Sequence, residues 1–322
     1  MDRPESSPAP GQPPAPSIEQ ELEEARIGHG IPTVRPLGED ELPARPPSRE
    51  SFRQGMLEGL RELWRYREVI YTLAWRDIRV RYRQAILGAT WALLNPLVLM
   101  VLFSLVFGTV AQIRPPGGVP YPIFSYVALV PWALFSGSLN YGSTSVVANS
   151  SIIRKVYCPR EAFPLAATFG AGFDFLMSSV VLVGMLLAYG YFPTLTWFAA
   201  LGLIVILYLL SVSLTMLVSI ITAFYRDTRY GVPLLVQVLL FATPIGYPLE
   251  RVTESGLGPV VKTLYVYANP LTPLIDGVRR ALLFGEWPQG GPLLSAVGIT
   301  VALMVFTYWT FKRFDAVISD VT

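Results

Sequence analysis

The 322-residue sequence contains only one cysteine, one histidine and three lysines. Because Cys158 is alone, no intrachain disulfide can form, and cysteine usage does not point to an oxidising compartment. The one histidine, His29, lies in a proline-rich N-terminal stretch. A Ser-His-Asp triad, a histidine metal site or a histidine proton relay would therefore lack its usual residue. These absences disfavour most classes of enzyme.

The three lysines also exclude a nucleotide-binding P-loop. That motif needs Gly-Lys-Ser/Thr, in which the lysine reaches the phosphates, and none of Lys155, Lys262 and Lys312 follows a glycine. After residue 50 there is also no Asp-x-Asp motif, which sugar-nucleotide transferases often use to hold a metal. We therefore expect this chain to bind no cofactor or metal, and any ATP to be hydrolysed on another chain.

Charge is scarce as well. Charged residues make up 15% of the sequence and hydrophobic residues 52%, with a mean hydropathy of +0.46. Soluble proteins carry roughly 25% charge. Residues 51–322 have about seven excess positive charges (20 basic against 13 acidic residues) and include long uncharged runs. A single soluble globule and a nucleic-acid binder with a basic groove are both excluded. The composition predicts an integral membrane protein.

The N-terminal 50 residues differ from the rest. They hold ten of the 23 acidic residues and 11 of the 28 prolines, a composition typical of disorder. They lack the apolar core and basic start of a signal peptide. We expect residues 1–50 to form a cytoplasmic tail, either a solvated extension or a regulatory or partner-binding segment.

A helix is predicted next, over residues 51–71. Phe52, Met56, Leu60 and Trp64 recur every four residues, and arginine and glutamate residues occupy much of the remaining surface. A basic amphipathic helix with a tryptophan suits a membrane surface. A linker helix packed on a partner would show the same pattern. We assign residues 51–87 to this interface helix and a basic segment, and residues 88–322 to the membrane domain.

Six transmembrane helices are predicted in an all-α membrane domain. The expected spans are 88–110, 123–149, 163–189, 195–222, 230–248 and 291–311. The first has no charge and 12 Leu, Val or Phe residues, which together favour insertion by about 4 to 7 kcal/mol. Small and polar residues in the second half of the second span favour close helix packing or a polar cavity.

Between the fifth and sixth spans lie two apolar pieces within residues 257–285, separated at Asn269-Pro270. Each has 12–15 residues, too few to cross about 30 Å of hydrocarbon, which predicts an outer re-entrant hairpin. Basic residues near the span ends divide 11 against five between alternate sides. The positive-inside rule then places both termini and the basic loops in the cytoplasm.

Asp174 is the one ionisable residue deep in a predicted span. A central carboxylate costs roughly 2.5–3.5 kcal/mol on insertion scales, which the hydrophobic residues of the third span can offset. Its side chain could face an aqueous path or carry protons. Alternatively, it could accept hydrogen bonds from Ser, Tyr or Arg on a neighbouring helix, or lie near the cytoplasmic side.

Four arginines, at positions 76, 79, 81 and 83, precede the first span. Guanidinium groups bind phosphate bidentately, so a lipid phosphate or pyrophosphate is a candidate ligand. A topology signal with nonspecific contact to anionic lipids would explain the same cluster. On a helix, Arg76, Arg79 and Arg83 share one stripe and Arg81 points elsewhere. The stripe is the predicted substrate-binding site.

Several of these segments together resemble a known family. They are residues 75–84 (WRDIRVRYRQ), Leu87-Gly88, Trp91, Asn95-Pro96, residues 150–164 and 224–230, and Asn269-Pro270-Leu271 with Arg279. Over about residues 60–320 the sequence is similar to type-2 ATP-binding-cassette (ABC) permeases that export O-antigen, capsule or teichoic acid. The acidic N-terminal tail departs from the shorter start that is usual in this family.

The resemblance implies a homodimer of six-span subunits in the bacterial cytoplasmic membrane. Two copies of a separate cytoplasmic ATPase would bind ATP and Mg²⁺, and the substrate would be an undecaprenyl-linked polysaccharide. The implied ATPase-coupling residues are Ser151, Ile152, Arg154, Lys155, Tyr157 and Pro159. The implied gating segment contains Tyr225, Arg226, Asp227 and Arg229. Alternatives are an exporter of a drug or another lipid, or a membrane glycan-transferring enzyme.

Overall fold

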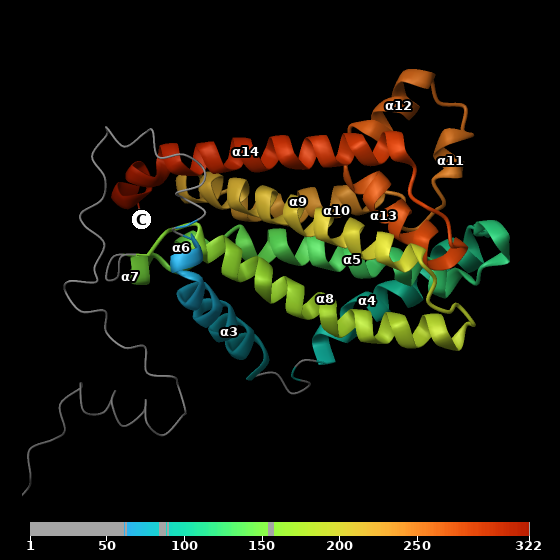
Figure 1. Ribbon diagram of the computed structural model, residues 1–322, viewed down its shortest axis with the longest axis horizontal. Helices are drawn as coiled ribbons and strands as arrows, with labels where there is room; N and C mark the ends of the chain where they lie inside the picture. Colours follow the sequence, from blue (N-terminus) through green and yellow to red (C-terminus); the bar gives the residue numbers. More distant parts are fainter. Residues whose placement is uncertain (1–60, 62, 84–87, 89, 154–157, 322) are drawn as a thin grey trace, which may run out of the picture. The chain divides into compact units, whose positions relative to one another are not determined.

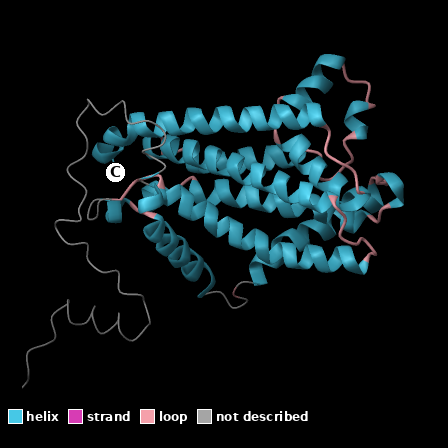
Figure 2. Cartoon of the chain, in the orientation of Figure 1, coloured by secondary structure: helices cyan, strands magenta, loops and turns pink. Residues whose placement is uncertain are grey.

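The computed structural model describes residues 61, 63–83, 88, 90–153 and 158–321. These residues form helices joined by loops, with no strand among them (Figure 2). The expected N-terminal tail and most of the expected interface helix lie outside the described residues. The prediction of an all-α chain is therefore confirmed for the part of the chain that the structure describes.

Five helices in this part of the chain are long and apolar enough to cross a membrane. They are α4 (Thr90–Phe103) continued by the π-helix η3 (Ser104–Val110), α5 (Tyr121–Gly142), α8 (Ala162–Ala188), α9 (Thr196–Phe224) and the apolar part of α14 (Gly290–Val321) up to Phe311. In Figure 1, α5, α8, α9 and α14 run side by side. Helix α5 packs against both α8 and α9.

The small residues of α5 allow close packing, as the sequence predicts. A Cβ atom added at Gly142 would lie 2.0 Å from Thr215 Cγ2 of α9, so only glycine fits at this crossing. Ser138 is fully buried and donates to the carbonyl of Leu134, which satisfies its hydroxyl within the helix. Helix α5 is therefore a core helix.

The second span ends earlier than predicted. Helix α5 stops at Gly142, and α6 (Ser145–Ala148) begins after a turn. At this turn the Ser143 hydroxyl bonds to the carbonyl of Asn140, and the Ser145 hydroxyl to that of Gly142. Such local side-chain bonds compete with a continuous helix. The predicted end at residue 149 is therefore wrong.

The predicted fifth span is also too long. Helix α10 covers Thr228–Ala242, 15 residues, whereas about 20 are needed to cross the hydrocarbon. Thr243 is extended (φ −116°, ψ 143°) because a residue before proline is disfavoured in the helical region. Pro233 lies inside α10 as predicted, but Pro244 does not.

After α10 come α11 (Glu250–Thr253), α12 (Pro259–Tyr267), α13 (Leu271–Arg279) and the π-helix η5 (Arg280–Phe284). Helices α12 and α13 are separated where the sequence predicts a break. Every residue of α13 is buried, whereas Val266 is the one buried residue of α12. Gly285 ends η5 in the left-handed region (φ 66°), which glycine adopts without strain.

Helix α3 (Arg67–Arg83) precedes the long helices and packs against α8. It lies near α6 and α7 (Ser150–Ile153) in Figure 1, whereas α11, α12 and α13 lie at the other end of the long helices. The basic segment before the first span is thus helical and in contact with the bundle.

Candidate functional site

Helix α3 packs against the bundle through apolar side chains near its start and through polar side chains near its end. The residues facing the bundle repeat at intervals of three and four, as expected for one side of a helix: Ile70, Leu73, Ala74, Asp77, Ile78 and Arg81. The first three belong to a buried cluster with Phe163 and Ala166 of α8. This register brings Arg81 to the inner side of α3.

Arg81 pairs with Asp174 of α8. Its Nη1 donates to Asp174 Oδ2 at 2.8 Å, and its guanidinium lies 3.6 Å from the ring centroid of Tyr141 on α5. A Cβ added at Gly170, one turn before Asp174, would lie 3.4 Å from Arg81 Nη2, so a larger side chain would crowd the guanidinium. Contacts from two other helices, α5 and α8, therefore hold this arginine of α3 in place.

Tyr82 completes the contacts of Asp174 by donating its hydroxyl to Oδ1. Burial and, next, this hydrogen bond raise the pKa of Tyr82, so its phenol stays protonated and keeps its proton for donation. Among the alternatives predicted for Asp174, the structure supports that of a hydrogen-bonded partner for Tyr and Arg on a neighbouring helix. We call Arg81, Tyr82, Tyr141 and Asp174 the α3 cluster.

Asp174 lies deep along α8. It is 12 residues beyond Ala162, where the helix begins, or about 18 Å along the axis. One turn further, the Ser178 hydroxyl donates to the carbonyl of Ala92 in α4 at 2.9 Å. The α3 cluster therefore lies where α3 ends and the first long apolar helix begins.

Arg76, Arg79 and Arg83 lie on the side of α3 opposite Arg81, but they do not share a partner. Arg76 bonds to Asp77 and, at 2.6 Å, to Asn149 after α6. Arg79 and Arg83 are exposed, and Arg79 lies 5.6 Å from the ring centroid of Trp75. The predicted stripe exists as an outer surface of α3, and Arg76 joins it to the segment after α5.

The predicted coupling residues are only partly described. Ser151 is exposed, Ile152 packs against the buried cluster beneath α3, and Pro159 is buried. Arg154, Lys155 and Tyr157 lie outside the described residues.

The predicted gating residues lie in the turn after α9 and, for Arg229, in the first turn of α10. Tyr225, Arg226, Asp227 and Arg229 are all exposed. Arg229 donates to the hydroxyl of Tyr230 at 2.8 Å. These four side chains face away from the packed interior, so a docking partner could reach them.

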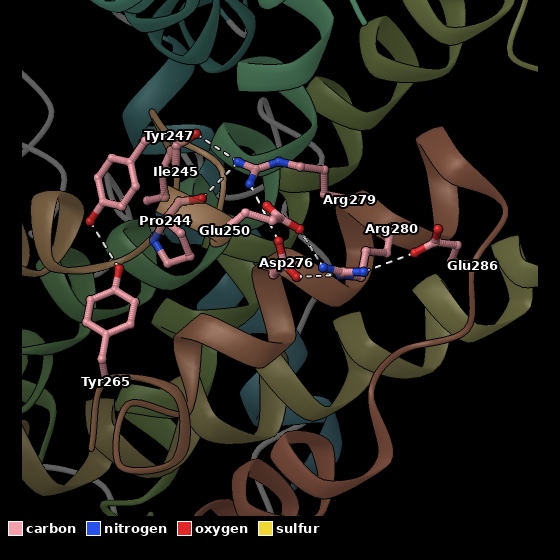
Figure 3. Close-up of polar contacts among 9 residues, drawn as sticks. All are labelled: Pro244, Ile245, Tyr247, Glu250, Tyr265, Asp276, Arg279, Arg280 and Glu286. Carbon is pink, nitrogen blue, oxygen red and sulfur yellow. Dashed lines mark hydrogen bonds and ion pairs between the residues drawn. The ribbon is translucent and has the colours of Figure 1, made fainter. Parts of the chain in front are cut away.

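A second group of charges, which the sequence analysis did not single out as a site, surrounds Arg280 (Figure 3). Its Nε donates to Asp276 at 2.8 Å, its Nη1 to Glu286 at 3.0 Å and its Nη2 to Glu250 at 2.7 Å. One guanidinium thus joins α13 to α11 and to the segment after η5. All three of its nitrogens are used.

Arg279, beside it, is 1% exposed. Its Nη2 donates to the carbonyls of Pro244 and Ile245 at 2.9 and 2.8 Å, and its guanidinium lies 3.9 Å from the ring centroid of Phe124. Arg279 thus connects the chain after α10 to α13 (Figure 3), and its ring contact extends this connection to α5. Nη1 is 3.8 Å from Asp276 Oδ1, but it makes no hydrogen bond to a described residue, and neither does Nε.

We call Glu250, Asp276, Arg279, Arg280 and Glu286 the α13 cluster. The spacing of Asp276, Arg279 and Arg280, three and four residues apart within an apolar piece, is the sequence signal that could have found its core. Glu250 and Glu286 come from flanking segments, and no pattern in the sequence connects them to it.

Comparison with known proteins places these features in a family. The model of the ABC-2 type transporter family matches residues 68–283, from α3 to η5, and so includes the whole α3 cluster and all of the α13 cluster except Glu286. The chain is 28% identical over 251 residues to the O-antigen export system permease protein RfbA of Myxococcus xanthus, covering 77% of this chain and 93% of that protein. It is 29% identical over 243 residues to an RfbA of Klebsiella pneumoniae, covering 73% and 90%. It is 23% identical over 218 residues to the polysialic acid transport protein KpsM of Escherichia coli, covering 67% and 81%.

Proposed function

The chain belongs to the ABC-2 type transporter family, and we propose that it exports an undecaprenyl-(pyro)phosphate-linked polysaccharide of the O-antigen or teichoic-acid kind. It is a membrane-embedded transport subunit, and a separate subunit hydrolyses ATP, so the alternative of a glycan-transferring enzyme is set aside. The observation that carries the proposal is the similarity, over nine-tenths of their length, to permeases named for O-antigen export.

The proposed topology has six crossings in the bacterial cytoplasmic membrane, with α10 as a short fifth. Helices α12 and α13 would form a re-entrant hairpin on the outer side. Both termini would be cytoplasmic, together with α3, α6, α7 and the turn between α9 and α10. The distribution of basic residues supports this orientation.

Cysteine labelling tests this topology in a Cys158→Ser background. A membrane-impermeant reagent added to intact cells should label Gly256→Cys, which lies between α11 and α12, and should spare Ser151→Cys on α7. The reverse pattern would overturn the orientation.

We propose further that the permease is a homodimer bound to two ATPase subunits. Residues 151–159 would dock into the ATPase, the segment 225–229 would move with gating, and the chain itself would bind no cofactor. Exposed side chains at Ser151 and Tyr225 support docking at this end of the bundle.

The outer side of α3 is the proposed first contact of the lipid-linked substrate. Arg79 and Arg83 are exposed there and Arg76 is partly exposed, so their guanidinium groups can reach a phosphate at the membrane surface. A bidentate donor distinguishes a phosphate from a neutral headgroup better than a lysine does.

Reconstitution with the ATPase subunit tests the substrate class. The complex in proteoliposomes should hydrolyse ATP faster when an undecaprenyl-pyrophosphate-linked glycan is added, and should not respond to undecaprenol, which lacks the phosphates. Stimulation by a drug or an unglycosylated membrane lipid, without a response to the lipid-linked glycan, would instead favour the second candidate, an exporter of such a compound.

A further inference from the structure

The α3 cluster contains a guanidinium whose binding capacity is only partly used. Among the described residues Asp174 is the one carboxylate that pairs with Arg81, and a single nitrogen, Nη1, makes that bond. Nε and Nη2 form no ion pair with a carboxylate in the part of the chain that the structure describes. The side chain of Arg81 is 22% exposed, so an incoming group can reach it.

We propose that Arg81 and Tyr82 form a phosphate-binding site, which Asp174 occupies until a phosphate oxyanion of the lipid-linked substrate displaces it. The ligand class is a phosphate or pyrophosphate ester carried on a lipid. This inference rests on the proposed function. It adds a second phosphate-binding site, at Arg81 and Tyr82, to the proposed first contact at Arg76, Arg79 and Arg83.

The geometry suits such an exchange. A carboxylate and a phosphate both present acceptor oxygens to an arginine, but each phosphoryl group of a pyrophosphate diester offers two non-bridging oxygens where Asp174 offers Oδ2 alone, since Oδ1 accepts the hydroxyl of Tyr82. The ring of Tyr141 holds the guanidinium in a fixed plane. Because Gly170 carries no Cβ, Nη2 has no side chain of α8 against it at this point, where an added Cβ would lie 3.4 Å away.

The location also suits a ligand that arrives from the bilayer. The α3 cluster lies where α3 ends and α4 begins, beside α8. Helix α4, whose Ala92 accepts the hydrogen bond of Ser178 one turn beyond Asp174, is largely exposed, with Trp91 at 55% and Val98 at 61% within this subunit. A lipid chain can lie along such an apolar surface while its phosphate turns towards Arg81.

Displacement requires an anion that takes the place of Asp174. Arg81 and Asp174 are 22% and 16% exposed, so the pair is mostly buried and the guanidinium needs a negative partner at every stage. A lipid-linked pyrophosphate diester carries two negative charges and can therefore compete with one carboxylate for Arg81. The apolar residues Ile70, Leu73 and Ala74 keep the other end of α3 packed while this exchange takes place.

The exchange and a purely structural ion pair predict opposite changes in the substrate concentration that Asp174→Asn needs for half-maximal response. Asp174→Asn keeps an oxygen that can accept the hydroxyl of Tyr82, but it removes the competing charge and places an NH2 donor where Oδ2 accepted from Arg81. If Asp174 competes with phosphate, this variant should respond to lower substrate concentrations. If Asp174 only positions α3, this variant should need more substrate, as Arg81→Gln should.

The experiment measures ATP hydrolysis by the permease–ATPase complex in nanodiscs against the concentration of undecaprenyl pyrophosphate. The half-saturating concentration should fall about three- to tenfold in Asp174→Asn and rise about tenfold in Arg81→Gln. The double variant should behave like Arg81→Gln, because Asp174 has nothing to compete for once the guanidinium is gone. Glu68→Gln, the same chemical change at an exposed position of α3, is the matched control and should leave the value unchanged.

A second variant covers the case in which Asp174→Asn does not fold, which thermal unfolding of the complex reports. Gly170→Ala keeps the ion pair but adds a methyl group 3.4 Å from Nη2. It should raise the half-saturating concentration about threefold without lowering the unfolding temperature. An unchanged value would overturn the proposal.

The remaining outcomes distinguish a failure of the Arg81–Asp174 exchange from a failure of the proposed function. If Asp174→Asn raises the half-saturating concentration or leaves it unchanged while the wild type responds, the exchange is wrong and the proposed function stands. If the wild type responds to neither undecaprenyl pyrophosphate nor the lipid-linked glycan, the proposed function fails and the exchange with it. An equal response to inorganic pyrophosphate, or to phosphatidylglycerol in the nanodisc, would overturn the assignment to the lipid-linked substrate.

Discussion

The two arginine clusters differ in how completely their guanidinium groups are paired. In the α13 cluster three carboxylates surround two guanidiniums, and all three nitrogens of Arg280 donate hydrogen bonds. In the α3 cluster one carboxylate meets one guanidinium through a single nitrogen. The α13 cluster therefore holds segments of the chain together, whereas the guanidinium of the α3 cluster still has nitrogens that can bind another anion.

Burial separates the clusters further. Arg279 is 1% exposed, so its removal would leave the carbonyls of Pro244 and Ile245 without a donor in a dry environment. Arg81 is partly exposed, and water or lipid headgroups can replace its partners. We therefore expect substitutions in the α13 cluster to act mainly on stability and those in the α3 cluster mainly on the response to substrate.

The largest loss of stability is expected for Arg279→Met. Methionine fills similar space but supplies no donor for the two carbonyls and leaves Asp276 with one fewer cationic neighbour, which should cost about 3–5 kcal/mol. Thermal unfolding of the purified permease measures this. Arg251→Met, at an exposed position of α11, is the control, and equal losses in both variants would contradict the structural role of Arg279.

Arg280→Lys should have the next largest effect, about 1–3 kcal/mol. A lysine keeps the charge, but its single ammonium cannot span three carboxylates from three segments as the planar guanidinium does. Unfolding temperature and protease cleavage between α11 and α12 both report the loosened segment. A variant as stable as the wild type would show that the three bonds of Arg280 contribute nothing net.

Asn149→Ala should destabilise by about 0.5–1.5 kcal/mol, because it removes the acceptor of Arg76 and so loosens α3 from the segment after α5. Ser179→Ala, which removes a partly buried hydroxyl of α8 bonded only within its own helix, is the comparison. If both variants lose the same stability, the tie between Arg76 and Asn149 adds nothing specific.

The smallest change in stability, within about 0.5 kcal/mol, is expected for the triple variant with lysine at positions 76, 79 and 83. Positive charge and therefore topology are kept, but bidentate contact with phosphate is lost. Export of the glycan at matched membrane levels should fall. Normal export would reduce the stripe to a topology signal.

The apolar helices could be predicted from the sequence because their hydrophobic runs are long and almost free of charged residues. It places the ends of the second and fifth spans wrongly, because these depend on local bonds of Ser143 and Ser145 and on the break before Pro244. The pairing of Arg81 with Asp174 joins residues 93 positions apart, and only the packing of α3 on α8 brings them together. The inward direction of Arg81 could be read from helical periodicity, but its partner could not.

Outward movement of the lipid-linked glycan is the measurement that tests the central claim most directly. Proteoliposomes with the ATPase subunit facing outward should, on addition of ATP, move the lipid-linked glycan from the outer leaflet into the lumen, out of reach of an added glycosidase. The account predicts that this protection requires ATP and hydrolysis-competent ATPase, and is lost when the permease is omitted. Protection that is equal without ATP, or none with the complete complex, would contradict it.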